Sequence, residues 1–536
     1  MNNRKRIILT SLFLAIVLTV PPLSNATQLP RTKSTDEIDL DPLTDITVTF
    51  QLQEIRAYDD IDLFSEADFY VKVTIDEQEF ISDIWKNMNY VVNPGWTATA
   101  NVPDYYEWVY ITVELWDWNL GLDTLCDIGG HEEEINLFNS STIELWYNTK
   151  TGMWTGEDYR EPYYFNADPS GYGRLNGCDD NSIYQDDNDC ELRFDITQPD
   201  PDGDGIPYWA EVNMYGTDPE VDNTGEDVDG DGCPIEWEHK WGVQYGYDWD
   251  TEEYVYWTWY HPYYYDEHDT LDPDSDGIEN TEEYLTSQWG SDPYRQDIFL
   301  ELDEMEPGPD GEGVFIPELS KTMLRDAYGK HNIMFFLDDY LEDEMTGGEL
   351  YPFDEEVTGH EMQEIYWKYF MHQDVDNWRR GVFHYGLITY HHEWFHGFCW
   401  HSELELPDNT TSVRRDCIHI ATKEHEVIPY NHTLLSLMAR RSLNREYHQA
   451  IIYASAIMHE TGHTLGIFHG NTPGCDDQQG KFPWQINWWK WLPYKSCMNY
   501  GWMYTMVDYS DGSRGRNDFD DWGSIDLTAF QKELFY

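Results

Sequence analysis

Three histidines late in the chain have the spacing of metal ligands on a helix and the turn that follows it. In "HETGHTLGIFH", His459 and His463 are four residues apart, and His469 follows six residues later. Residues four apart share one face of a helix, so both imidazoles can reach one ion. Gly466 tolerates a positive φ, which lets the chain leave the helix and return His469 to that ion. Three nitrogen donors with an open fourth position are typical of catalytic zinc.

Glu460 follows the first histidine directly and projects about 100° around the helix axis from it. It is therefore outside the ligand pair, but close enough to accept a proton from water at the metal. The alternative is a buried helix that carries scattered histidines. Gly466 and His469, at their observed spacing, favour the metal site over that alternative.

The elements around this segment predict an α/β domain with a twisted sheet over residues 296–536. The run "REYHQAIIYASAIMHETGHTLGIFHG" has the length and apolar spacing of a long helix, and "IPELSKTMLRDAYGK" predicts a second helix that ends near Gly329. The apolar runs "QDIFLELDEM", "HNIMFFLDD" and "RRGVFHYGLITYH" predict strands. Strands that alternate with helices are typical of α/β domains.

The histidine segment resembles the extended H-E-x-x-H-x-x-G-x-x-H motif of the metzincin zinc endopeptidases. A second element, "SCMNY" at 496–500, resembles their Met-turn, in which Met498 would lie beneath the histidines. The resemblance implies one catalytic zinc, protein or peptide substrates, and Glu460 as the general base. It also implies that Tyr500 stabilises the oxyanion, and that an edge strand above the helix pairs with the substrate backbone. The pair Cys475 and Cys497 weakly resembles the pappalysin-like subgroup, but no subgroup is assigned.

Three acidic loops repeat between residues 200 and 283: "DPDGDGIPYWAE", "DVDGDGCPIEWE" and "DPDSDGIENTEE". Each has acids at positions 1, 3 and 5, glycine at 6 and glutamate at 12, which is the spacing that supplies oxygen ligands to calcium. Position 7 contributes a backbone carbonyl. The predicted ligands are Asp200, Asp202, Asp204, Ile206 and Glu211; Asp227, Asp229, Asp231, Cys233 and Glu238; and Asp272, Asp274, Asp276, Ile278 and Glu283. Prolines argue against long flanking helices, and the segment resembles thrombospondin type-three-like repeats, with about three or more structural calcium ions along a stalk at 196–295.

Residues 44–150 show period-two runs rich in Val, Ile, Tyr and Trp, which predict an antiparallel β-sandwich. Acids lie at its strand ends, namely Asp59, Asp60, Asp62, Asp68, Asp117 and Asp123, together with Asn119. The arrangement resembles the calcium-dependent sandwich domains named C-two. Solvation of hairpin loops by these acids is an equally weighted alternative. Residues 151–195 have no clear period and predict an irregular connector.

The N-terminus predicts export. Basic residues at 4–6 precede an apolar stretch at 7–20, and cleavage after Ala26 would remove residues 1–26 as a signal peptide. An uncleaved anchor is the alternative. Residues 27–43 predict a linker or short pro-segment. In an exported chain the eight cysteines are expected to be oxidised, and local spacing suggests the pairs Cys178–Cys190, Cys399–Cys417 and Cys475–Cys497.

The net charge of −71, from 103 acidic and 32 basic residues, argues against nucleic acid as a partner. Membrane association is expected only through calcium and the sandwich domain. The chain is thus predicted to be a multidomain, secreted or cell-surface, calcium-stabilised zinc metalloendopeptidase. A calcium-dependent binding protein whose metal domain is inactive is one alternative, and a zinc-dependent amidase is another. The intact Glu460 disfavours an inactive domain.

Overall fold

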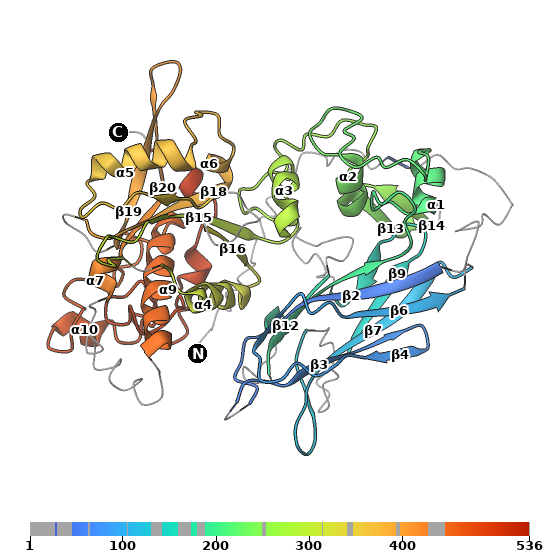
Figure 1. Cartoon of the computed structure of the whole chain (residues 1–536), viewed down its shortest axis with the longest axis horizontal. Helices are drawn as coiled ribbons and strands as arrows, with labels where there is room; N and C mark the ends of the chain where they lie inside the picture. Colours follow the sequence, from blue (N-terminus) through green and yellow to red (C-terminus); the bar gives the residue numbers. More distant parts are fainter. Residues whose placement is uncertain are drawn as a thin grey trace, which may run out of the picture.

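The computed structural model describes residues 27–28, 46–62, 65–103, 105–129, 142–158, 173–179, 188–248, 253–313, 315–339, 347–392, 397–426 and 445–534. The predicted signal peptide and all but two residues of the predicted linker lie outside them. In the described part of the chain, no helix is both long enough and apolar enough to span a membrane. The chain forms a sandwich, a module of acidic loops and an α/β domain (Figure 1).

The sandwich consists of two antiparallel sheets that enclose one core. Their orders are β10-β9-β7-β3-β4, with β8 on β7, and β11-β12-β2-β5, with β6 on β2. Side chains alternate between buried and partly exposed along β3 and β7, as period-two patterning requires. The strands are β2 (Ile46–Ala57), β3 (Phe69–Ile75), β4 (Gln78–Ile81), β5 (Tyr90–Val92), β6 (Thr97–Val102), β7 (Trp108–Asp117), β8 (Thr124–Leu125), β9 (Ile143–Asn148), β10 (Trp154–Gly156), β11 (Arg174–Asn176) and β12 (Cys190–Thr197).

The prediction of an irregular connector over 151–195 is wrong for its described residues. Strand β12 pairs with β2 from Cys190 to Thr197, and its other edge pairs with β11. The sandwich therefore continues to Thr197. Strands β10 and β11 are three residues each, which is too short for a period-two pattern to appear in the sequence.

The acidic loops alternate with short helices, as the prolines predict. These are α1 (Tyr208–Ala210), η2 (Glu211–Tyr215), α2 (Ile235–Gly242), α3 (Asn280–Thr286) and η3 (Ser287–Trp289). Between α2 and α3 lies the hairpin of β13 (Val243–Asp248) and β14 (Glu253–Thr258). Strand β1 (Thr27–Gln28) pairs with β14, so the start of the predicted linker belongs to this sheet.

The α/β domain is built on a sheet of order β16-β15-β18-β20-β19, with β17 on β15. All pairs are parallel except that of β19 with β20, and β19 forms one edge. The strands are β15 (Asp297–Met305), β16 (Met334–Asp339), β17 (Leu350–Tyr351), β18 (Phe383–Thr389), β19 (Gly397–Glu405) and β20 (Thr411–Ala421). Three strands were predicted; the third begins later than expected, because Arg379–Val382 form the short helix α6.

Helices cover both faces of this sheet. One core joins alternate residues of β15 to α4 (Glu318–Gly329) and α9 (Arg445–Thr464), and a second joins the other face to α5 (Gly359–Ile365) and η4 (Tyr366–Phe370). Figure 1 shows α4 and α9 side by side on one side of the sheet. The remaining elements are η1 (Gly177–Asp179) in the sandwich and α7 (Thr422–Glu426), α10 (Ile486–Lys490), η5 (Trp522–Ser524) and η6 (Ala529–Gln531) here.

Polar side chains connect the sandwich to the α/β domain. Arg56 of β2 donates to Asp326 of α4 at 2.7 Å, and Asn176 of β11 donates to the Gly329 carbonyl at 2.8 Å. Arg174 of β11 contacts Asn332 at 2.8 Å and forms a buried ion pair with Glu191 of β12 at 2.6 Å. Each domain thus supplies partners for polar groups of the other. We name this contact the domain joint.

Candidate metal centre

Helix α9 places His459 and His463 on one buried face, as the sequence predicts. Their side chains are buried, and the helix ends at Thr464. Gly466 follows with a φ of 91°, the positive value expected from the motif. Ile467 closes the turn through its N–H, which donates to the Gly462 carbonyl at 2.9 Å.

All three predicted zinc ligands have Nδ1 bonded to a backbone carbonyl. His459 donates to Cys497 at 2.9 Å, His463 to Ile467 at 2.7 Å and His469 to Cys475 at 2.9 Å. A carbonyl only accepts, so each Nδ1 carries the proton and each neutral ring has its lone pair on Nε2. Carbonyl partners of this kind orient metal-binding histidines and fix their tautomer.

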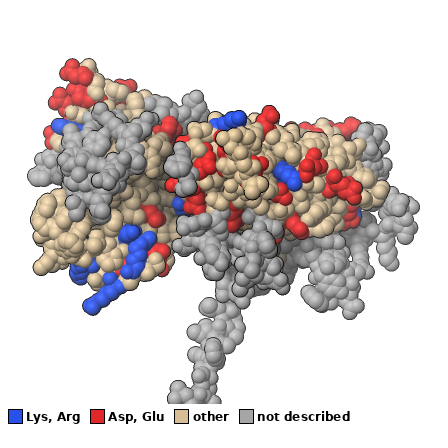
Figure 2. Space-filling view, turned by 90° about the horizontal axis from the view of Figure 1, so that it is seen from below, with Lys and Arg blue, Asp and Glu red and all other residues tan. Residues whose placement is uncertain are grey.

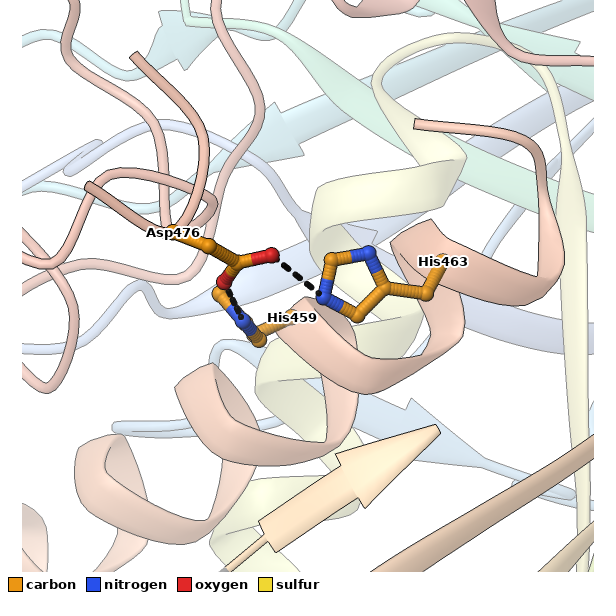
Figure 3. Close-up of side chains that lie close together, drawn as sticks. All are labelled: His459, His463 and Asp476. Carbon is orange, nitrogen blue, oxygen red and sulfur yellow. Dashed lines mark ion pairs between the residues drawn. The ribbon is translucent and has the colours of Figure 1, made fainter. Parts of the chain in front are cut away.

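A carboxylate that the sequence did not reveal lies between two of these lone pairs (Figure 3). Asp476 has Oδ1 3.1 Å from His459 Nε2 and Oδ2 3.3 Å from His463 Nε2. Donors around a tetrahedral zinc ion at about 2.0–2.2 Å lie about 3.3–3.5 Å from one another. Two lone pairs and a carboxylate repel unless a proton or a cation neutralises them. The residues present therefore fit a divalent ion.

Electrostatics at this cluster follow from that arrangement. Burial alone would lower the pKa of His459, but Asp476 and Glu460 raise it to about 9. Burial alone would raise the pKa of Asp476, but the two imidazoles hold it far below its usual value. The cluster thus strongly favours positive charge at its centre.

His469 is exposed, in contrast to the other two histidines. Its ring is anchored by the carbonyl of Cys475, the residue before Asp476. The donor atoms of His459, His463 and Asp476 all lie within 4.8 Å of one another. Asp476 is therefore a candidate ligand beside His469. It reaches the site from an irregular loop, at a positive φ of 54°.

Glu460 is buried and faces the edge strand of the sheet. A Cβ added at Gly397, the first residue of β19, would lie 3.1 Å from Glu460 Oε1. Burial raises the pKa of Glu460, whereas the two histidines and the backbone N–H of Cys399 lower it. The carboxylate thus lies between the histidine cluster and the edge strand β19.

The segment "SCMNY" lies beneath the helix, as the resemblance implies. Met498 is completely buried, and its carbonyl accepts the N–H of Asp476 at 3.2 Å. Tyr500 stacks on the His459 ring, with centroids 5.5 Å apart and planes at 19°. Burial, with Asp476 and Glu460 nearby, holds the pKa of the Tyr500 phenol far above its usual value. The phenol therefore stays protonated and can donate a hydrogen bond.

Gly462 is expected to be needed for this packing. An added Cβ would lie 2.5 Å from Met498 Sδ and 3.0 Å from Tyr509 Oη. We expect Gly462→Ala to lose stability by overpacking, by about 1–3 kcal/mol, less the gain of about 1 kcal/mol from better helix propensity. Gly470→Ala is the matched control, because a Cβ there meets no atom within 4 Å. Chemical denaturation should show a loss for the first variant only, and equal stability of the two would contradict this packing.

The three acidic loops share one backbone conformation. The first aspartate of each accepts N–H groups three and five residues later, at 2.7–3.2 Å in every case. Glycines at position 6 have φ of 86°, 101° and 96°. The three aspartates of each loop also lie close enough together to hold a metal ion. The repeat seen in the sequence is therefore a structural repeat.

Carboxylates in these loops crowd one another. Burial, together with Asp204 and Asp202, raises the pKa of Glu211 to about 7. In the third loop the sequence missed Asp297, whose carboxylate is buried, makes no hydrogen bond and interacts with those of Asp276 and Glu283. Asp297 is the first residue of β15, and its N–H donates to Asp276 at 2.7 Å. The third loop is thus tied directly to the α/β sheet.

The cysteines are not arranged as the spacing suggested. All eight are thiols in this structure. Cys190 lies against Cys126 and not against Cys178, whose sulfur is 3.6 Å from Asp189 Oδ2. The pair Cys178–Cys190 is therefore a wrong prediction, because β12 carries Cys190 into the sandwich core. Cys399 and Cys417 lie on the paired strands β19 and β20, as proposed.

The sandwich gathers its predicted acids at one end. Asp117 is buried and accepts the N–H of Asp68 at 2.7 Å and the amide of Asn119 at 2.8 Å. Between Asp117 and Asp123, the loop exposes Leu120 by 98% and Leu122 by 91%. Elsewhere acidic side chains are spread over the face shown in Figure 2 and basic ones are few, which accords with the charge of the chain.

Comparisons with known proteins leave the family open. No family model matches the sequence, and no curated protein matches it either. Human GIVD cytosolic phospholipase A2 with methyl gamma-linolenyl fluorophosphonate aligns with 29% of this chain at 15% identity and a TM-score of 0.16, and the alignment spans 17% of the phospholipase. A structure described as a C2 domain aligns over 28% of this chain and 97% of its own, at 13% identity and 0.16. The two calcium-bound C2 domains of extended-synaptotagmin 2 align over 30% and 47%, at 10% and 0.18. These scores indicate only a weak, partial likeness to C2 domains.

Proposed function

We propose that the chain is an exported zinc metalloendopeptidase with cation-stabilised accessory domains. The observation that carries this proposal is the convergence of His459 and His463 on one point beside Glu460. Their Nε2 lone pairs face a shared carboxylate at 3.1 and 3.3 Å, and their Nδ1 atoms are held by carbonyls. The resemblance of "HETGHTLGIFH" and "SCMNY" to metzincin motifs supports the same activity.

The zinc, held by His459, His463 and His469 or Asp476, would activate water and polarise the scissile carbonyl. Glu460 accepts the proton of the attacking water on its carboxylate and delivers it to the leaving amine. Its burial supports this role, because a carboxyl with a raised pKa holds the transferred proton more readily. Tyr500, protonated beside His459, donates to the developing oxyanion.

The edge strand β19 offers a place for the substrate backbone. Within the described chain, β19 pairs only with β20, so one row of its backbone groups is available to an extended peptide. Glu460 lies beside the start of that strand at Gly397. A peptide bound there would pass close to the base and the histidines.

The proposal is tested by zinc content and peptide cleavage on the full chain. We expect one zinc per chain, loss of cleavage with phenanthroline, and recovery when zinc is added back. His459→Ala should lose the zinc. Comparing Asp476→Ala with His469→Ala decides which side chain is the third ligand, because that variant should lose zinc and the other should keep it. Zinc-free protein that still cleaves peptides would sink the proposal. A peptide library separates an endopeptidase from an amidase.

Calcium is proposed to hold the first and third acidic loops. A site filled at about 100 times its Kd adds about 2.7 kcal/mol to stability. In a Glu460→Ala background, which prevents self-digestion, we expect a chelator to accelerate trypsin cleavage within 196–295. Added calcium should reverse the effect and magnesium should not. Glu283→Gln should be cleaved faster than the exposed control Glu220→Gln. Cleavage rates unaffected by the chelator would contradict calcium binding.

The exposed Leu120 and Leu122 favour a second proposed function, calcium-dependent attachment to a membrane surface. Burying a leucine contributes about 1.5–3 kcal/mol, so the pair can provide a strong anchor once nearby acids are neutralised. Leu120→Ser/Leu122→Ser is expected to weaken sedimentation with phosphatidylserine vesicles about 100-fold or more, in the presence of calcium. Ile81→Ser is the control, because Ile81 is 57% exposed on β4, outside this loop. Equal binding by both variants would remove the loop as an anchor.

A further inference from the structure

The second acidic loop differs from the other two, because a histidine enters its carboxylate cluster. His268 follows β14 in the chain and is completely buried. Its Nε2 lies 3.5 Å from Asp231 Oδ2 and 3.9 Å from Glu238 Oε1. The donor atoms of these three residues all lie within 4.8 Å of one another, and all three residues are buried.

Several polar atoms here have no hydrogen bond. They are Nε2 of His268, Oε1 of Glu238 and both oxygens of Asp229. Buried polar groups almost always have a partner, and a group of orphans that face one point calls for a missing one. At 3.5 and 3.9 Å, Nε2 is too far from the oxygens for a hydrogen bond. An ion that bonds to both atoms at about 2.0–2.2 Å fits that separation.

The charges in this cluster favour a cation. Asp227, Asp229, Asp231 and Glu238 bring four carboxylates together, and Asp231 is shared between the aspartate group and the histidine group. Burial, Asp231 and Asp229 raise the pKa of Glu238 to about 10. A divalent ion would relieve the repulsion that holds a proton on this side chain.

The nitrogen donor decides which cation fits. Calcium takes oxygen ligands, whereas imidazole suits zinc, copper, iron and nickel. The first and third loops gather aspartates alone. We infer that the second loop binds a first-row transition-metal ion, such as zinc, through His268, Asp231, Glu238 and the remaining aspartates. This inference rests on the proposed function only in assuming that the acidic loops hold cations.

Asn280 supports the histidine from behind. Its side-chain amide lies 2.9 Å from His268 Nδ1, and its Oδ1 has no hydrogen bond. The oxygen and nitrogen of an asparagine exchange places when the amide flips. With Oδ1 toward the ring, Nδ1 donates to it and Nε2 presents its lone pair to the loop. That is the second-sphere arrangement typical of metal-binding histidines.

The test uses the full chain carrying His459→Ala and His463→Ala, which removes the other histidine pair. Metal-free protein is titrated with zinc against a chromophoric chelator, with and without excess calcium. We expect one tight zinc that calcium does not displace. His268→Gln should weaken it about tenfold or more, whereas His360→Gln, on a side chain that is 86% exposed, should not. Calcium binding by the first and third loops reports whether each variant is folded.

X-ray absorption of the zinc-loaded parent, at one equivalent, gives a reading that needs no variant at position 268. An imidazole among the oxygen neighbours of zinc supports the inference, and oxygen neighbours alone overturn it. Equal zinc affinity in the His268→Gln and His360→Gln proteins also overturns it. If calcium displaces the zinc, the inference falls and the calcium proposal extends to this loop. If neither metal binds any loop, the inference and the proposed calcium sites fall together.

Discussion

Glu460→Gln is expected to reduce peptide hydrolysis about 100- to 10,000-fold while one zinc stays bound, because a general base contributes about that factor. The side chain lies outside the histidine pair and touches the start of β19, so its loss should not disturb the ligands. Single-turnover kinetics with a fluorogenic peptide, combined with metal analysis, measure both quantities. The loss should appear in kcat, because the amide keeps the shape of the site.

Two companions make that result decisive. Glu364→Gln, whose side chain is 68% exposed on α5, should keep full activity. His459→Ala should lose zinc and activity together. If Glu460→Gln kept more than about a tenth of the activity, another group would be the base and the proposed mechanism would be wrong.

Arg174→Ala is expected to cost about 3–5 kcal/mol of stability, because it leaves the carboxylate of Glu191 buried without its main partner. Both side chains are at most 3% exposed, and Tyr58 donates to the same carboxylate. Urea denaturation of the metal-loaded protein measures the loss. Lys532→Ala, from an exposed ion pair with Asp526, should cost less than about 1 kcal/mol. The double change Arg174→Met/Glu191→Leu should recover much of the loss.

The same ion pair predicts a pH dependence. Burial would raise the pKa of Glu191, but Arg174, Arg56 and Tyr58 lower it from 4.5 to about 2. A carboxyl whose pKa is lowered by folding stabilises the protein above pH 4.5, and that contribution is lost as pH falls from 4.5 to 2. Its full size is about 3 kcal/mol, because one pKa unit corresponds to about 1.4 kcal/mol. Arg174→Met/Glu191→Leu should lack this part of the acid sensitivity, and an identical acid profile in both proteins would contradict it.

The sequence predicted those parts of the site that lie on regular elements. The helix α9, the positive φ of Gly466 and the place of Met498 followed from spacing and motif. Asp476 did not, because it enters from an irregular loop whose course is fixed by its N–H to Met498 and by Cys475 holding His469. No local pattern encodes such long-range contacts.

The same distinction applies to the rest of the fold. Loops with strict spacing at 200–283 were visible as a repeat, yet Asp297 and His268 join them from outside that spacing. The long strands of the sandwich showed period two, whereas β10 and β11 are too short to show it. Cys190 was therefore paired wrongly, because the strand that places it beside Cys126 was not recognised.

The domain joint limits where this chain can be cut. A fragment that begins at 296 would leave Asp326 without Arg56, Asn332 without Arg174 and the Gly329 carbonyl without Asn176. It would also separate Asp297 from the third acidic loop. The proposed catalytic part is therefore not an independent unit that can be transplanted, and exchanging domains with another protein would require grafting β2, β11 and the face of α4 together.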